Sequence, residues 1–213
     1  MPHKLLRPWQ TASHPVGDAI ADLQNGWSPK CLDRPADAGE WGVLKLGAVS
    51  FGEYDPAVNK ALPSHLSPMP EYEVKPGDVL ISRANITHVG ACAYVYRTRA
   101  QLLLCDKIFR VLFKKETLID GQFIAAIMKT QVVRRQIENS FTGTSPTMKN
   151  ISKPALLNLL IPLPAFSEHV SIMEQLEDCH TKAHTARTTA TATREAAAEV
   201  FTAALFTTTN KRL

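Results

Sequence analysis

Residues 165–213, AFSEHVSIMEQLEDCHTKAHTARTTATATREAAAEVFTAALFTTTNKRL, differ sharply in composition from the rest of the chain. They contain no glycine and no proline, whereas both residues recur throughout residues 1–164. Alanine, glutamate and arginine are frequent here and favour a helix, although the many threonines favour it less. The sequence therefore predicts a globular domain over residues 1–164, followed within 165–213 by one long helix from about Ser167 to Phe206.

This helix carries a periodic apolar stripe. Ten positions alternate in steps of four and three residues, and nine of them hold an apolar side chain or a thiol. The positions are Ile172, Leu176, Cys179, Ala183, Ala186, Ala190, Thr193, Ala197, Val200 and Ala204. Such a stripe is a coiled-coil seam, and its central alanines let two helices approach closely. A helix of about 40 residues is roughly 60 Å long. This seam is too long for the domain to cover, so we expect a partner helix; the alternative is a helix folded back on its own domain.

Residues 1–164 have the pattern of an α+β domain with a strand-rich core. The segment Lys75-Pro76-Gly77-Asp78 places Pro and Gly at the centre of a type II turn that leads into a strand at Val79–Arg83. Asp120 is suited to cap a helix whose apolar residues continue at a helical period to Ile137, and a short helix is predicted near Pro154–Leu157. Further runs of strand length are Val43–Val49, Ala91–Tyr96, Leu102–Cys105 and Ile108–Phe113.

Charge is distributed unevenly along the domain. Residues 16–78 hold five basic and ten acidic side chains, whereas residues 80–115 hold seven basic and one acidic, and residues 129–153 hold five basic and one acidic. Two basic blocks in an otherwise acidic domain indicate a positive face that binds a polyanion such as DNA. A solvated charged surface is the alternative.

Several classes of protein do not fit this sequence. No run of 18 apolar residues occurs, so no transmembrane helix is expected, and the first residues lack the apolar core of a signal peptide. The four cysteines lie far apart and have no histidine at zinc-binding spacing. We expect reduced thiols in a cytoplasmic protein with no bound metal.

The sequence shows no recognisable catalytic machinery. It has no Pro-Pro pair for a methyltransferase motif, the loop at Gly143 lacks the second glycine of a cofactor-binding loop, and no Gly-Lys-Ser/Thr is present for nucleotide binding. Asp55, Glu73 and Lys75 resemble a nuclease set only loosely, because Lys75 begins the Pro-Gly turn. We therefore expect a protein that is not an enzyme and binds no cofactor; a nuclease or methyltransferase with unfamiliar motifs is the alternative.

Two segments carry a family resemblance. Residues 75–85, KPGDVLISRAN, followed by Val89-Gly90, resemble the Gly-Asp-hydrophobic-Leu-hydrophobic-Ser/Thr-Arg stretch in specificity subunits of type I restriction-modification systems. Residues 143–168 resemble the segment that joins the target recognition domain of that family to its helix. With Asp106-Lys107 and the final helix, the resemblance spans most of the chain. One departure is visible: residues 164–169 read PAFSEH, where the family usually has Pro-Pro-Leu-x-Glu-Gln.

The resemblance implies a half-length form of such a subunit. A full-length member carries two target recognition domains, each reading half of a split sequence in double-stranded DNA, with two antiparallel helices between them. It directs methyltransferase (modification) subunits and a motor-nuclease restriction subunit to that site. One domain (1–164) and one helical segment (165–213) imply a homodimer through the seam, on an interrupted palindrome. The alternatives are a partner carrying a different half, a longer parent chain, and a coiled-coil adaptor that binds proteins without DNA.

Three sets of residues are predicted to contact DNA. The first follows the Gly-Asp strand, where Arg and Asn suit the edges of guanine and adenine: Arg83, Asn85, Thr87 and His88. The second combines small hydroxyls with a lysine, which suit phosphate oxygens: Thr144, Ser145, Thr147, Lys149 and Asn150. The third would contact the charged backbone: Lys45, Arg97, Arg99, Lys107 and Arg110. For each residue, a structural role inside the domain is the alternative.

Overall fold

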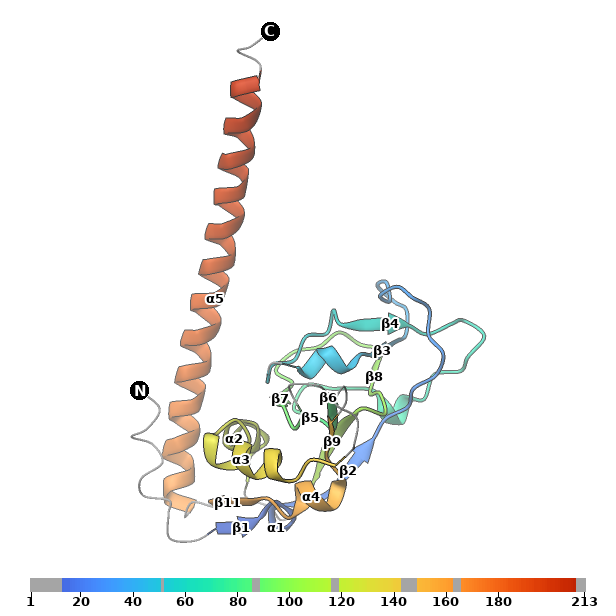
Figure 1. Ribbon diagram of the computed structural model, residues 1–213, viewed down its shortest axis with the longest axis vertical. Coiled ribbons are helices and arrows are strands. Elements are labelled where there is room, and N and C mark those ends of the chain that lie inside the picture. Colours follow the sequence, from blue (N-terminus) through green and yellow to red (C-terminus); the bar gives the residue numbers. More distant parts are fainter. Residues whose placement is uncertain are drawn as a thin grey trace. The chain divides into compact units, whose positions relative to one another are not determined.

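The computed structural model describes residues 13–50, 52–85, 89–115, 119–142, 149–162 and 166–209. The chain forms two compact units, residues 1–166 and residues 167–213. The first unit mixes strands with short helices, and the second is a single long helix (Figure 1). The α+β fold class with a long C-terminal helix, predicted from the sequence, is confirmed.

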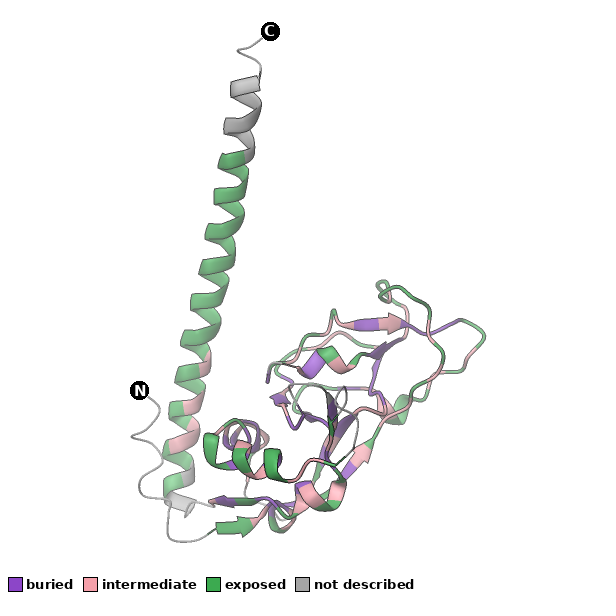
Figure 2. Cartoon of the chain, in the orientation of Figure 1, coloured by how far each residue is buried: buried purple, intermediate pink, exposed green. Residues whose placement is uncertain are grey.

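Two sheets form the centre of the first unit. The larger is antiparallel, with the strand order β2 (Ile20–Asn25), β9 (Ile108–Phe113), β5 (Val79–Ser82) and β7 (Cys92–Tyr94). The smaller has the order β4 (Asn59–Ala61), β3 (Gly42–Leu44) and β8 (Leu102–Leu103), in which β3 and β8 are parallel. One cluster of buried side chains joins the sheets, since it includes Leu44 of β3, Leu80 of β5 and Ile108 of β9. Figure 2 shows burial concentrated on these strands.

Short elements complete the first unit. Two two-stranded pairs are antiparallel, one between β1 (Ser13–Pro15) and β11 (Leu160–Pro162) and one between β6 (Ala84–Asn85) and β10 (Lys149–Asn150). The helices are α1 (Val16–Ala19), η3 (Leu46–Val49), η4 (Pro70–Tyr72), α2 (Gly121–Ile127), α3 (Gln131–Asn139) and α4 (Lys153–Leu157). No helix among the described residues is long and apolar enough to cross a membrane.

The turn before β5 is confirmed. Asp78 N donates to Lys75 O at 3.1 Å, and Gly77 has a φ of 94°, which glycine adopts without strain. The Asp78 carboxylate accepts the Lys75 amide at 2.9 Å and closes the turn from its other side. Arg110 of β9 reaches this carboxylate at 3.3 Å, so the turn is held to the sheet.

Two predicted elements differ in the structure. The strand predicted at Val43–Val49 ends at Leu44, and a 3-10 helix follows, because the chain there bonds to itself instead of to a neighbouring strand: Ala48 N donates to Lys45 O at 2.9 Å. The single helix predicted after Asp120 is two helices, α2 and α3. Asp120 caps α2 as expected, accepting from Gln122 N at 2.7 Å. The backbone of Thr130 is extended and starts α3.

The second unit is α5 (Phe166–Thr209), of 44 residues. Every residue from Thr181 to Phe201 is exposed, including the predicted seam from Ala183 to Val200. Ile172 and Leu176 of the seam are partly buried, Cys179 is exposed, and the side chain of Ala204 lies outside the described residues. The hydroxyls of Thr185, Thr188 and Thr193 donate to carbonyls four residues earlier at 2.9–3.0 Å. These threonines therefore satisfy their polar groups within the helix.

Candidate nucleic-acid interface

The pairing of β6 with β10 brings together the two segments predicted to contact DNA. Asn85 is opposite Lys149 and Ala84 is opposite Asn150, in antiparallel register. Thr142 exchanges two backbone hydrogen bonds with Asn150, at 2.9 and 3.0 Å. Because the strands are antiparallel, the chain that leaves β6 after Asn85 and the chain that enters β10 at Lys149 meet at the same end of the ladder. The pairing therefore joins the two predicted segments at Asn85 and Lys149.

The described residues contain only part of the two predicted segments. Thr87, His88, Thr144, Ser145 and Thr147 lie outside the described residues, and only the backbone of Asn85 is described. Their assignment as base or phosphate contacts stays a prediction. The described stem consists of β6, β10 and the residues that support them.

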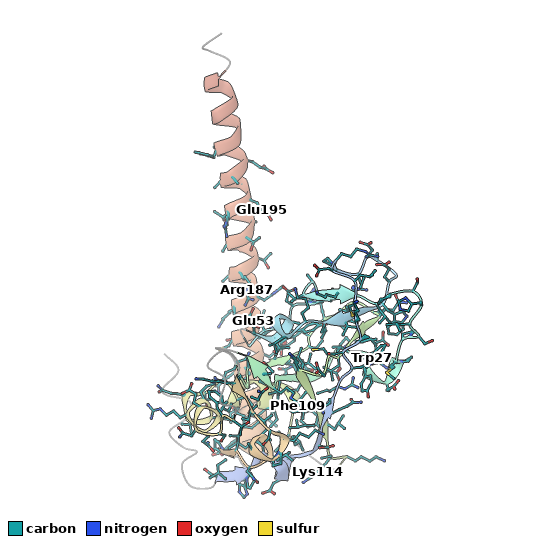
Figure 3. The ribbon with its side chains drawn as sticks, turned by 45° about the vertical axis from the view of Figure 1, so that its right-hand side comes forward. Trp27, Glu53, Phe109, Lys114, Arg187 and Glu195 are labelled. Atoms are coloured by element: carbon teal, nitrogen blue, oxygen red, sulfur yellow. The ribbon has the colours of Figure 1, made fainter. Side chains whose placement is uncertain are left out.

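Arg83 supports this stem from inside the domain. Its Nη1 donates to Asp106 O at 3.4 Å, and its guanidinium lies 5.4 Å from the ring centroid of Phe109. Phe109 is buried on β9, among the side chains of the globular unit (Figure 3). The Arg83 backbone donates to Lys107 O and accepts from Ile151 N, both at 3.0 Å. Arg83 thus ties the end of β5 to β9 and to the residue after β10.

Arg110 is also held within the domain. Its side chain is 12% exposed and donates to the backbone oxygens of Glu71 (2.6 Å) and Glu73 (2.8 Å), in addition to Gln24 Oε1 and the Asp78 carboxylate. This arrangement connects β9 to β2 and to the turn before β5. A guanidinium engaged on all sides serves the fold, so Arg110 is a weak candidate for contacting phosphate.

Arg99 is held in a different loop. Its Nη1 donates to Glu40 O at 3.0 Å and to Ala100 O at 3.2 Å, and its Nη2 is buried without a hydrogen-bond partner. A Cβ on Gly42 would lie 3.1 Å from that Nη2, so the guanidinium packs directly against the start of β3. Arg99 therefore supports the smaller sheet.

The remaining predicted cations lie nearer the surface. Lys45, Arg97 and Lys149 are exposed, and Lys107 is partly buried. The ammonium of Lys149 lies 5.1 Å from the ring centroid of Phe141, a distance that permits a cation–π contact. Asn150 is partly buried within the β10 pairing. Among the predicted cations of the described residues, Lys149 is thus the one that lies within the β6–β10 pairing, opposite Asn85.

Helix α3 contacts Val89 and Gly90, which precede β7. The sequence did not predict this contact. Arg134 Nη1 donates to Val89 O at 2.7 Å, where the chain returns toward β7. Gly90 follows with a φ of 71° and donates to Ser82 O at 2.7 Å. A Cβ on Gly90 would lie 2.8 Å from Ile137 Cγ2, so any larger residue there would have to displace the Ile137 side chain. The signal in the sequence was the second basic block, which contains Arg134.

The candidate catalytic groups have local structural roles. Glu73 Oε1 accepts the Gln101 amide at 2.7 Å, and Asp55 Oδ1 accepts the Ala57 amide at 2.9 Å. Within the described part of the chain, no three His, Cys, Asp or Glu side chains are grouped so that they could hold a metal ion. Burial raises the pKa of the Cys92 thiol to about 12 and that of Cys105 to about 11, so both thiols stay protonated at neutral pH.

Comparison with known proteins identifies relatives. No protein-family model matches the chain. The specificity subunit of the type I restriction enzyme EcoEI from Escherichia coli is 34% identical over 165 residues, which are 76% of this chain and 28% of that subunit. The specificity subunit of MjaVIII from Methanocaldococcus jannaschii is 27% identical over 168 residues, 74% of this chain and 37% of that subunit. The chain thus spans well under half the length of the curated relatives it matches.

Solved structures share the fold. The HsdS subunit from Thermoanaerobacter tengcongensis superimposes with a TM-score of 0.54 at 17% identity, over 83% of this chain and 43% of that one. A chain from a study of assembly and conformational transition in the type I R-M system gives a TM-score of 0.52 at 17% identity, over 82% and 39%. In sequence and in fold, this chain is a relative of the specificity subunits of type I restriction enzymes.

Proposed function

We propose that this chain is a sequence-specific DNA recognition subunit of a type I restriction-modification complex. The observation that carries the proposal is the β6–β10 pairing, which joins the two segments predicted to contact DNA. The chain that contains this pairing is 34% identical to the EcoEI specificity subunit over 165 residues. The domain over residues 1–164 acts as the target recognition domain. Lys149 and the exposed cations Lys45 and Arg97 contact phosphates, and the loops beyond β6 and before β10 supply base contacts.

The partners follow from the same relationship. Methyltransferase and restriction subunits carry the chemistry, and this chain directs them to a split site on double-stranded DNA. The chain itself is not catalytic, since its candidate carboxylates accept backbone amides and its most buried thiols are protonated. We place it in the cytoplasm, where free thiols such as the exposed Cys179 persist.

A second copy of the chain completes the subunit. The seam of α5 from Ala183 to Val200 is exposed along its whole length, and Val200 and the adjacent Phe201 are 70% and 66% exposed. A long exposed apolar seam is stabilised by burying it against another helix. We propose that the helices of two copies pair antiparallel, which gives a homodimer with two-fold symmetry and an interrupted palindrome as its target.

DNA binding can be tested by fluorescence anisotropy at several salt concentrations. We expect affinity to fall steeply with salt, because binding to phosphates releases counterions. Lys149→Met should reduce the slope of log K against log salt by about 1. Lys30→Met, an exposed lysine in the acidic part of the domain, is the matched control and should leave the slope unchanged. A protein that does not bind DNA at low salt would instead be an adaptor for other proteins.

The absence of catalysis has its own test. The purified chain is incubated with DNA, magnesium and S-adenosylmethionine, and the DNA is analysed for strand breaks and for methyl groups. Neither product is expected from this chain alone. Cleavage or methylation that follows the protein through purification would contradict the assignment as a non-catalytic subunit.

A further inference from the structure

The β6–β10 pair forms a two-stranded sheet of its own, and Arg83 links it to the larger sheet. Arg83 directly follows β5, and its N–H donates to Lys107 O, just before β9, at 3.0 Å. Its carbonyl oxygen accepts from Ile151 N, directly after β10, at 3.0 Å. A pair of such short strands is marginally stable on its own. The position of this pair therefore depends on how firmly Arg83 is held.

The side chain of Arg83 is held between two fixed groups. Its guanidinium lies 5.4 Å from the ring centroid of Phe109, within the range of a cation–π contact, and Phe109 is only 2% exposed (Figure 3). Its Nη1 donates to Asp106 O at 3.4 Å. Asp106 is held in turn by Ser28, whose hydroxyl accepts from the Asp106 amide at 3.2 Å and donates to its carboxylate at 2.5 Å. The guanidinium therefore fixes the point at which the chain passes from β5 to β6.

Lys149 lies across the strand pair from this anchor. It is opposite Asn85 of β6, two residues beyond Arg83, and its neighbour Asn150 is opposite Ala84. Lys149 is exposed, whereas Arg83 is partly buried. A phosphate can thus reach the ammonium of Lys149, whereas the guanidinium of Arg83 is already engaged within the domain.

From these contacts we infer that Arg83 is a positioning residue for DNA binding. Its guanidinium holds the β6–β10 pair against β9 and so sets where Lys149 presents its charge to a phosphate. A charge that is held in place in the free protein loses less conformational entropy on binding than one on a loose segment. The inference rests on the proposed function, and it replaces the base contact that the sequence predicts for Arg83 with a role inside the domain.

A double-mutant cycle on the full chain tests this role through the salt dependence of binding to a DNA duplex of mixed sequence. Lys149→Met should reduce the slope of log K against log salt by about 1, as for any phosphate contact. Arg83→Met should by itself also reduce the slope by about 1, because Lys149 is no longer held in place. Adding Lys149→Met to Arg83→Met should then reduce it no further. A protein that is merely less stable binds in a smaller amount with the same slope.

Arg99→Met is the matched control for the cycle. Arg99 is also partly buried and donates from Nη1 to backbone oxygens, at 3.0 and 3.2 Å, but it supports the smaller sheet. In the Arg99→Met protein, Lys149→Met should still reduce the slope by about 1. A difference between the two backgrounds assigns the effect to the contacts of Arg83 and not to the loss of an arginine in general.

Amide hydrogen exchange, measured by NMR in the absence of DNA, gives a second readout. The amides of Asn150 and Ile151 donate to Thr142 O and Arg83 O, both at 3.0 Å. In Arg83→Met both amides should exchange about 10-fold faster, because the strand pair opens locally. The amide of Val95, in a 2.8 Å hydrogen bond directly after β7, should change far less.

Three results would overturn the inference. A Lys149→Met effect that is the same in Arg83→Met as in wild type would show that the two residues act independently, and the proposed function would stand. Unchanged exchange at Asn150 and Ile151 in the folded variant would show that the guanidinium does not hold the strand pair. Where Arg83→Met does not fold, Arg83→Lys is measured in its place and should show the same direction of change. No binding of the unmodified protein to DNA at low salt would overturn the inference together with the proposed function.

Discussion

At the scale of single residues, the arginines of the two basic blocks divide into structural and surface groups. Arg83 and Arg110 donate to backbone carbonyls inside the domain, whereas Arg97 is exposed. All three are predicted from the sequence as DNA contacts, and that stays a prediction; residue type and local charge do not reveal which carbonyls come within reach once the chain has folded. These bonds join residues far apart in the sequence, such as Glu71 and Arg110.

The division of the arginines predicts that one substitution lowers the free energy of unfolding strongly and that another barely changes it. Arg110→Met removes a partly buried guanidinium that satisfies two carbonyls, an amide oxygen and a carboxylate, so we expect a loss of about 2–4 kcal/mol in the free energy of unfolding. Arg135→Gln, at an exposed position of α3 in the second basic block, should change it by less than about 0.5 kcal/mol. Urea unfolding followed by circular dichroism measures both. An Arg110→Met protein as stable as wild type would show that its bonds are not maintained in solution.

At the scale of elements, turn chemistry and periodicity predicted the features that depend on neighbours in the sequence, but not strands such as β2 and β4. The Pro-Gly turn, the strand after it, the cap at Asp120 and the long helix each depend on neighbours in the sequence. The break between α2 and α3 was missed because it contains no glycine or proline. Instead Thr130 leaves the helical conformation, while its hydroxyl donates to Ile127 O at 2.7 Å. The β6–β10 pairing is long-range, and sequence patterns do not specify it.

Packing of α3 against the loop after β6 predicts a specific cost at Gly90. Gly90 and Gly39 both have positive φ, so alanine at either position should cost about 1 kcal/mol in the free energy of unfolding from backbone strain. At Gly90 the new methyl group also meets Ile137, whereas Gly39 has no atom within 4 Å. Gly90→Ala should therefore cost about 1–3 kcal/mol more than Gly39→Ala. Equal losses in thermal or urea unfolding would show that α3 moves aside freely.

At the scale of the whole molecule, the sequence predicted two parts and left their association open. The composition changes near residue 165, and the structure divides into two compact units at residue 166. The seam predicts a partner helix, because a helical period reveals which face is apolar. It does not by itself identify what covers that face. The proposal of a second copy rests on the exposure of the seam from Ala183 to Val200, and the proposal of DNA rests on the β6–β10 pairing and on the relatives.

Selection of bound sequences from a randomised DNA library tests the central claim most directly. The protein, alone and with the methyltransferase subunit proposed as its partner, is incubated with the library, and the retained DNA is sequenced over several rounds. A dimeric recognition subunit should enrich two identical half-sites in inverted orientation, separated by a gap of fixed length with no sequence preference. Retained DNA with no enriched sequence, in samples that bind DNA, would contradict sequence recognition by this chain.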